Sequence, residues 1–197
     1  MSLLGLSGLA LLPAGMVAAA SLVVTTVDEK GVPLEHVALA LLPVGASAPA
    51  PTTPLAEIGQ QNKTFIPLMS TVQTGTSVSF PNRDTVRHHV YSFSPAKTFE
   101  LKLYAGTPAR PVVFDKPGLV VLGCNIHDQM VAYVMVSDTP WLAVTDAAGV
   151  ARLGGFPAGE YELQYWHPRW LGRPELPKKR FRIERDQTEV LIIKDKP

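Results

Sequence analysis

The sequence predicts an all-β protein, and three observations support this. Short runs of β-branched and apolar residues recur along the chain, with turn residues between them. Eighteen prolines and fifteen glycines are spread over the 197 residues, as many short strands and turns require. No stretch of the sequence shows a convincing helical period. Regularly spaced short strands of this kind are typical of β-sandwiches.

The first twenty residues resemble a secretory leader. They contain no charged side chain, residues 3–12 are apolar, and Ala18, Ala19 and Ala20 offer small residues for a cleavage site. We therefore expect a signal peptide over 1–20, export to the periplasm, and no stable membrane insertion of the mature chain. Because no Lys or Arg precedes the apolar run, either the true start lies further upstream or the segment is an uncleaved anchor. Gly5 and Pro13 interrupt that run, which is already marginal for spanning a bilayer.

The mature chain opens with two expected strands, at 21–27 and 36–42, joined by turn residues at 28–31. Residues 43–54 follow. They are rich in Pro, Ala and Thr and lack apolar periodicity, which indicates an extended linker and a domain boundary.

The middle of the chain contains a series of expected strands. Residues 76–80 alternate with period two, as a half-buried strand should, whereas 131–136 are apolar throughout. The expected strands are 65–68, 71–72, 76–80, 88–93, 97–103, 111–114, 119–122 and 131–136. Residues 137–140 mark a second boundary. Five more strands are expected beyond it, at 141–145, 150–153, 160–167, 180–184 and 188–193, and a basic, proline-rich loop at 168–178.

Composition narrows the function classes. The chain is 46% hydrophobic and 18% charged with a formal net charge of +1, which is ordinary for a globular protein and gives no basic face for nucleic acid. Its single cysteine excludes an internal disulfide. The sequence shows no Ser-His-Asp set, no paired acids at meaningful spacing and no phosphate loop, so we do not expect an enzyme.

One loop carries a metal-binding pattern. Cys124 is followed at intervals of three by His127 and Met130, so one face of a loop can present all three side chains. A second imidazole stands upstream in the pair His88 and His89. Two histidines, a thiolate and a methionine are the ligand set of a mononuclear blue-copper site. We therefore predict one copper ion bound by His88, Cys124, His127 and Met130.

The histidine pair leaves two interpretations open. Side chains alternate along a strand, so Val90 would share the face of His88, and we prefer His88 as the ligand. His89 then either forms a hydrogen bond through a ring nitrogen or competes as a ligand. His36 and His167 have no spaced partner and are expected not to bind metal.

The middle segment resembles a cupredoxin over about residues 56–136. The Cys-x-x-His-x-x-Met loop is similar to that of amicyanin, and residues 114–124 resemble the family's approach to its cysteine. His88 lies six residues after Asn82, the amicyanin spacing. The resemblance implies a Greek-key β-sandwich, a type 1 copper site with Met130 as its weak axial ligand, and single-electron transfer. Where the family usually has Asn after the first ligand, this chain has His89.

The flanking segments have a resemblance of their own. Residues 23–41 resemble the opening hairpin of a carboxypeptidase-regulatory or transthyretin-like sandwich, and 143–163 resemble its middle. This implies a discontinuous β-sandwich, 21–48 plus 139–197, with the cupredoxin domain, 55–138, inserted in it. The alternative is a cupredoxin with unrelated strands at each end.

Chains with this combination are similar to methylamine-utilisation-type proteins. That similarity implies redox partner proteins in the periplasm, in an amine-oxidising system. The leading expectation is therefore an exported carrier of single electrons. The alternative is a periplasmic protein that stores or delivers copper without electron relay, and a third is a structural sandwich stapled by its metal.

Overall fold

The computed structural model describes residues 19–50, 55–108, 110–172 and 176–194. The predicted all-β class is confirmed: the described residues form seventeen strands and one turn of 3-10 helix, η1 (Pro168–Trp170). Residues 1–18 of the expected leader lie outside these ranges, and its last residue, Ala20, begins the first strand. Over the described ranges, no helix has the length and apolar character to span a membrane.

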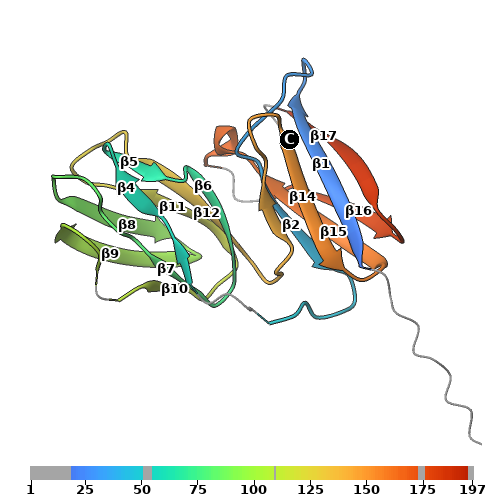
Figure 1. The fold of residues 1–197 in the computed structure, drawn as a ribbon, viewed down its shortest axis with the longest axis horizontal. Coiled ribbons are helices and arrows are strands. Elements are labelled where there is room, and N and C mark those ends of the chain that lie inside the picture. Colours follow the sequence, from blue (N-terminus) through green and yellow to red (C-terminus); the bar gives the residue numbers. More distant parts are fainter. Residues whose placement is uncertain (1–18, 51–54, 109, 173–175, 195–197) are drawn as a thin grey trace, which may run out of the picture.

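Strands from the two ends of the chain form two sheets with each other (Figure 1). The first sheet has β1 (Ala20–Asp28) at its centre, antiparallel to β14 (Val150–Phe156) and parallel to β17 (Gln187–Ile193). The second has the order β13 (Leu142–Val144), β2 (Ala38–Pro43), β15 (Gly159–Trp166) and β16 (Lys178–Ile183).

Alternation along β1 builds the core between these two sheets. Leu22 and Val24 are buried, and their neighbours Ser21, Val23 and Thr25 are half-buried. They join one hydrophobic cluster with Leu39 of β2, Leu163 of β15 and Leu191 of β17. Because side chains on a strand alternate between faces, β1 places one of its faces in this core, whereas β2 is buried at four consecutive positions, Ala38 to Leu41.

The middle of the chain forms the other half of the molecule, drawn from teal to yellow in Figure 1. A three-stranded sheet has the order β10 (Val112–Phe114), β7 (Thr76–Ser79) and β3 (Leu55–Glu57). A five-stranded sheet has the order β6 (Met69–Gln73), β12 (Val131–Ser137), β11 (Gly118–Gly123), β8 (His88–Ser94) and β9 (Lys97–Tyr104). A separate hairpin of β4 (Gly59–Gln61) and β5 (Thr64–Ile66) completes this half of the molecule.

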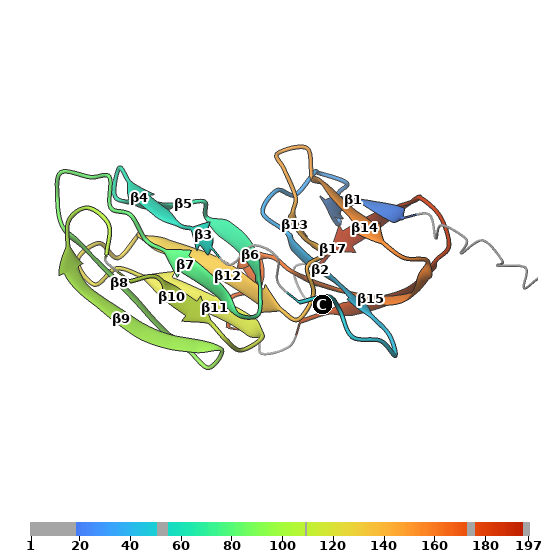
Figure 2. The ribbon, with the colours of Figure 1, turned by 60° about the horizontal axis from the view of Figure 1, so that its bottom comes forward.

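The strand β12 explains how the two halves meet. Val134 lies in the hydrophobic cluster of the middle segment, whereas its neighbours Tyr133 and Met135 lie in the cluster of the flanking strands. The ring of Tyr133 lies 5.1 Å from that of Trp166, between centroids. Figure 2 shows the two halves side by side along the long axis. Both faces of β12 are therefore buried, which accounts for its fully apolar sequence.

Some expected elements differ from the structure. The second strand begins at Ala38 rather than at 36, because His36 has a φ of 64°, which ends the extended conformation there. The short strands β3 and β4 and the helical turn η1 were not expected. The first residue of the expected linker, Pro43, ends β2, and the rest of its described part, 44–50, contains no strand. The domain boundaries at 48, 55 and 139 stay a prediction.

Candidate metal centre

Three of the four expected ligands converge on one point. The sulfur of Cys124 lies 4.0 Å from Nδ1 of His88 and 4.0 Å from Nδ1 of His127. The two imidazole centroids are 5.1 Å apart, and the three donor atoms all lie within 4.8 Å of one another. Sulfur and nitrogen donors that bind one zinc ion at about 2.0–2.3 Å are at most about 4.4 Å apart. Both Cys-to-His separations therefore fit a single first-row metal ion.

The sheet brings these side chains together from distant parts of the sequence. His88 is the first residue of β8, and Cys124 directly follows β11. These strands are neighbours, with Gly123 paired to Tyr91. His127 lies in the short connection to β12, which pairs with β11 on its other side. The site thus sits at one end of the sheet, where strand ends and a loop meet.

Met130 closes this loop. Its amide donates a hydrogen bond to the carbonyl of His127 over 2.9 Å. Its side chain is 1% exposed and belongs to the same hydrophobic cluster as Cys124, which is 4% exposed. The expected fourth ligand therefore lies buried next to the site, and its coordination stays a prediction. His88 is fully buried, whereas His127 is partly exposed.

The two adjacent histidines have different partners. His88 turns Nδ1 toward Cys124, and its Nε2 lies 2.7 Å from Oδ2 of Asp84. His89 lies with Nε2 3.0 Å from Glu100, and its ring is edge-on to Tyr91. The structure thus brings His88 into the cluster and directs His89 to a carboxylate elsewhere.

Asp84 is a residue of the site that the sequence did not reveal. Burial raises the pKa of its carboxyl, but hydrogen bonds from the Lys63 amide, from His88 and from the Asn62 amide outweigh this and hold the pKa below its usual value. Asp84 is therefore a carboxylate at neutral pH. In the sequence it looked like an ordinary turn residue, and its spacing of four from His88 was the only available signal.

Polar contacts fix the segment that leads to His88. The side-chain nitrogen of Asn82 donates to the carbonyls of Val86 and Tyr104, over 2.9 and 3.0 Å. The hydroxyl of Tyr104 donates to the carbonyl of Phe80 over 2.7 Å and also contacts Gln60. Burial raises the pKa of Tyr104 to about 12; the Gln60 contact opposes this rise, and the nearby Cys124 adds to it.

The remaining histidines lie in the other half of the molecule. His36 pairs with Glu35 at 3.5 Å. His167 caps η1, where its Nδ1 accepts a hydrogen bond from the Arg169 amide over 3.2 Å, and burial lowers its pKa. Neither belongs to the metal-binding group found among the described residues.

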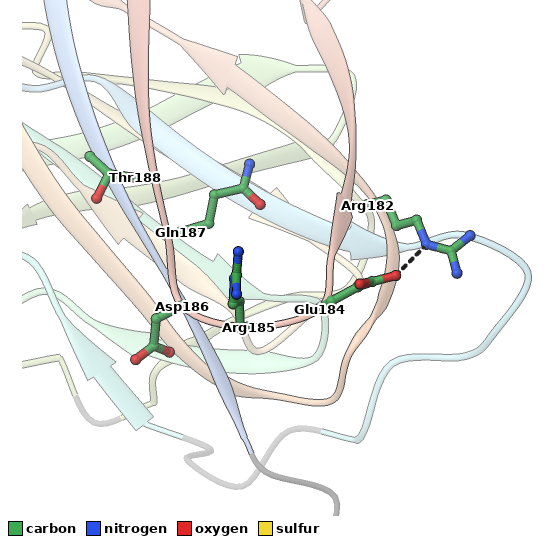
Figure 3. A pocket seen from close by; sticks show the side chains of 6 residues that line it. All are labelled: Arg182, Glu184, Arg185, Asp186, Gln187 and Thr188. Atoms are coloured by element: carbon green, nitrogen blue, oxygen red, sulfur yellow. Dashed lines mark hydrogen bonds and ion pairs between the residues drawn. The ribbon is translucent and has the colours of Figure 1, made fainter.

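A separate hollow of about 620 Å³ lies at the turn between β16 and β17. Figure 3 shows its charged lining, in which Arg182 bonds to Glu184 over 2.9 Å. Two arginines and two acidic side chains line it, so its lining carries charges of both signs.

Several solved structures resemble part of the chain, and their descriptions name copper proteins. One is a purple cupredoxin from Nitrosopumilus maritimus, at 25% identity over 42% of this chain and 98% of that one, with a TM-score of 0.36. A reduced Cu(I) form of an amicyanin mutant is 15% identical over 50% of this chain and 98% of that one, with a TM-score of 0.38.

A copper-containing nitrite reductase from Thermus scotoductus is 24% identical over 56% of this chain but only 28% of that one, with a TM-score of 0.39. No protein-family model matches the chain, and no curated protein does. Since all three TM-scores lie below 0.5, the assignment of the site rests on its own donor set and distances.

Proposed function

We propose that this protein binds one copper ion through His88, Cys124 and His127, with Met130 as the fourth ligand, and transfers single electrons between redox partners. The observation that carries the proposal is the convergence of one sulfur and two imidazole nitrogens at 4.0 Å separations. Thiolate and thioether favour the reduced ion and imidazoles serve both states, so this donor set fits copper. A bound copper ion supplies one-electron redox chemistry.

The protein's own residues hold the site rigid and dry. His88 and Cys124 are fixed at the ends of paired strands, and both are buried. Because these strands cannot shift independently, the donor positions change little when the charge of the site changes. A site that reorganises little exchanges electrons quickly.

His127 offers the route to the surface. It is the partly exposed ligand, and two exposed apolar side chains lie in the ligand segments, Ile126 at 47% and Val86 at 41% exposure. Exposed apolar side chains in the segments that carry the ligands favour brief contact with a partner protein. We further propose that the protein is exported to the periplasm and meets its redox partners there, because residues 1–20 resemble a secretory leader.

A copper titration tests the proposal. We expect Cu(II) to bind one-to-one with an intense visible absorption band from thiolate charge transfer, and the site to be reduced reversibly by one electron. Cys124→Ser should abolish the band and keep the far-ultraviolet circular dichroism spectrum. His89→Gln is the matched control, because His89 lies beside His88 but faces Glu100, and it should keep the band.

Two outcomes would contradict the electron carrier. A protein that stays colourless with Cu(II) and takes up only Cu(I) would favour copper storage or delivery. A band that survives in Cys124→Ser would refute the assignment of the sulfur ligand.

A further inference from the structure

A carboxylate lies directly behind the buried histidine of the candidate copper site. The side chain of His88 is fully buried, and that of Asp84 is 12% exposed. They meet at 2.7 Å, between Nε2 of His88 and Oδ2 of Asp84. The other ring nitrogen of His88 faces the sulfur of Cys124. The imidazole is thus held between a carboxylate on one side and the metal position on the other.

The carboxylate itself is fixed. Each of its oxygens accepts a backbone hydrogen bond, Oδ1 from Asn62 over 2.6 Å and Oδ2 from Lys63 over 2.9 Å. Both residues are in the left-handed region, with φ of 55° and 57°, so their successive amides point at the same anion. The amide of Asp84 also donates to the side-chain oxygen of Asn82 over 2.9 Å. Asp84 therefore cannot turn away from His88.

This arrangement sets which nitrogen of His88 carries the proton. A carboxylate accepts hydrogen bonds, so Nε2 donates its proton to Asp84 and Nδ1 keeps its lone pair toward Cys124. A carboxylate behind a ligating imidazole also makes that ligand more basic. A negative charge near the ion stabilises its higher oxidation state relative to the lower one.

We propose that Asp84 is a positioning residue of the copper site, which fixes the orientation and tautomer of His88 and lowers the reduction potential of the bound ion. The inference rests on the proposed function for its redox part. Its geometric part concerns only the metal-free protein. Glu100 provides the comparison, because it lies 3.0 Å from Nε2 of the neighbouring His89 but is half-exposed and forms no hydrogen bond with it.

Potentiometry of three copper-loaded variants tests the redox part. Asp84→Asn keeps a hydrogen-bonding oxygen and removes the charge. We expect it to shift the ratio of the Cu(II) and Cu(I) dissociation constants about tenfold toward Cu(I), a rise of about 59 mV for one electron. Asp84→Ala also removes the hydrogen bond and should weaken Cu(II) binding about 10–100-fold. Glu100→Gln is the matched control and should leave the potential and the visible band unchanged.

Heteronuclear NMR of the imidazole nitrogens in the metal-free protein tests the geometric part. We expect His88 to carry its proton on Nε2 in the wild type, and Asp84→Ala to lose this single tautomer. If Asp84 only anchored the β4–β5 turn, Asp84→Asn and Asp84→Ala would lower the melting temperature but leave the potential of the loaded protein unchanged, which would overturn the proposal.

The two proposals fail separately. If the wild type binds copper with the expected band and both Asp84 variants match its potential and affinity, the positioning role is wrong and the proposed function stands. If the wild type binds no copper, the proposed function is wrong. The tautomer of His88 then decides the geometric part alone: a proton on Nδ1 overturns it, and a proton on Nε2 that depends on Asp84 supports it.

Discussion

The ring of Tyr91 lies against the backbone of Gly123, the residue directly before Cys124. A methyl group at position 123 would stand 2.8 Å from Cζ of the tyrosine. The two residues are partners in the pairing of β8 with β11, the two strands that carry His88 and lead to Cys124. Only glycine allows this close approach without movement next to the site.

Gly123→Ala should therefore disturb both stability and the metal centre. The added methyl forces Tyr91 aside, and because the atoms that must move are the far end of a half-buried side chain, we expect the free energy of unfolding to fall by about 1 kcal/mol, the low end for overpacking. We expect denaturant unfolding to show this loss and the visible copper band to change. Placing the substitution in a Tyr91→Ala background should remove most of the added cost, as a double-mutant cycle would measure.

Gly154→Ala is the control for Gly123→Ala, because a methyl group at that strand position meets its nearest neighbour at an ordinary 3.8 Å. It should leave the copper band unchanged. An unchanged band in Gly123→Ala as well would show that Tyr91 moves without affecting Cys124.

Met130→Leu tests the fourth ligand. Leucine has a similar volume, so the substitution should lower stability by less than about 1.5 kcal/mol although the site is buried. The visible band should persist, because it arises from the thiolate. The reduction potential should rise, because the axial ligand tunes the potential. Loss of this donor lowers the coordination number, which Cu(I) tolerates better than Cu(II), and we expect this effect to outweigh the loss of a soft ligand. Met135 provides the control, because it is buried in the hydrophobic cluster of the flanking strands. Met135→Leu should change neither the visible band nor the reduction potential. Equal potentials in all three proteins would remove Met130 from the ligand set.

Tyr104 predicts a loss of stability in alkali. Burial raises its pKa in the folded protein to about 12, against the ordinary value of 10.0 for a tyrosine. The folded state therefore binds a proton that the unfolded state releases, and this contribution to stability is present below pH 10 and lost as the pH rises to about 12. Two pKa units correspond to at most about 2.7 kcal/mol. Because Tyr104 is only partly buried, solvent screening reduces the expected loss to about 2 kcal/mol.

Tyr104→Phe should flatten the pH dependence over that window. Denaturant unfolding of the metal-free protein at pH 8 to 12 measures how the free energy of unfolding falls with pH. Tyr104 should contribute at most about 1.36 kcal/mol per pH unit between its two pKa values. The other tyrosines are common to both proteins, so their contribution cancels in the difference. Identical slopes for the two proteins would contradict the prediction.

Two buried tryptophans should respond differently to phenylalanine. The indole nitrogen of Trp170 donates to the carbonyl of Lys194 over 2.7 Å, whereas that of Trp166 has no hydrogen-bond partner among the described residues. Trp170→Phe leaves a carbonyl without its donor, but Trp166→Phe removes a polar group that was itself unpaired. We expect Trp166→Phe to lower the free energy of unfolding by about 1–2 kcal/mol less than Trp170→Phe. Equal losses in calorimetry would contradict this.

The sequence predicts the strands well where side-chain alternation or continuous burial determines them. The strand at 76–80 follows its period-two pattern to Ser79, and β12 follows its apolar run. The pattern fails where backbone conformation decides. The left-handed φ of His36 moves the start of β2, and β3 and β4 are too short, at three residues each, for a pattern to develop.

In the candidate site, too, the sequence reveals some residues, whereas other contacts depend on how distant segments fold together. Cys124 and His127 are close in sequence and could be found by spacing, and His88 by its distance of six residues from Asn82 in the family resemblance. The contact of Asp84 with His88 depends on the turn at Asn62 and Lys63, which folds against it from another part of the chain. The approach of Tyr91 to Gly123 depends on the pairing of two strands. Neither contact has a periodic signature in the sequence.

The place of β1 in its sheet has a consequence for how this chain acquires its shape. Both of its partners emerge late in synthesis: Thr26 contacts Gly149, 123 residues downstream, and Ser21 contacts Asp186, 165 residues downstream. Closing loops of this size is slow, because the entropy must be lost before any contact forms. We expect β1 to stay unpaired on that side until β17 has been synthesised, so a truncation that removes β17 should leave β1 vulnerable to proteases and to chaperone capture.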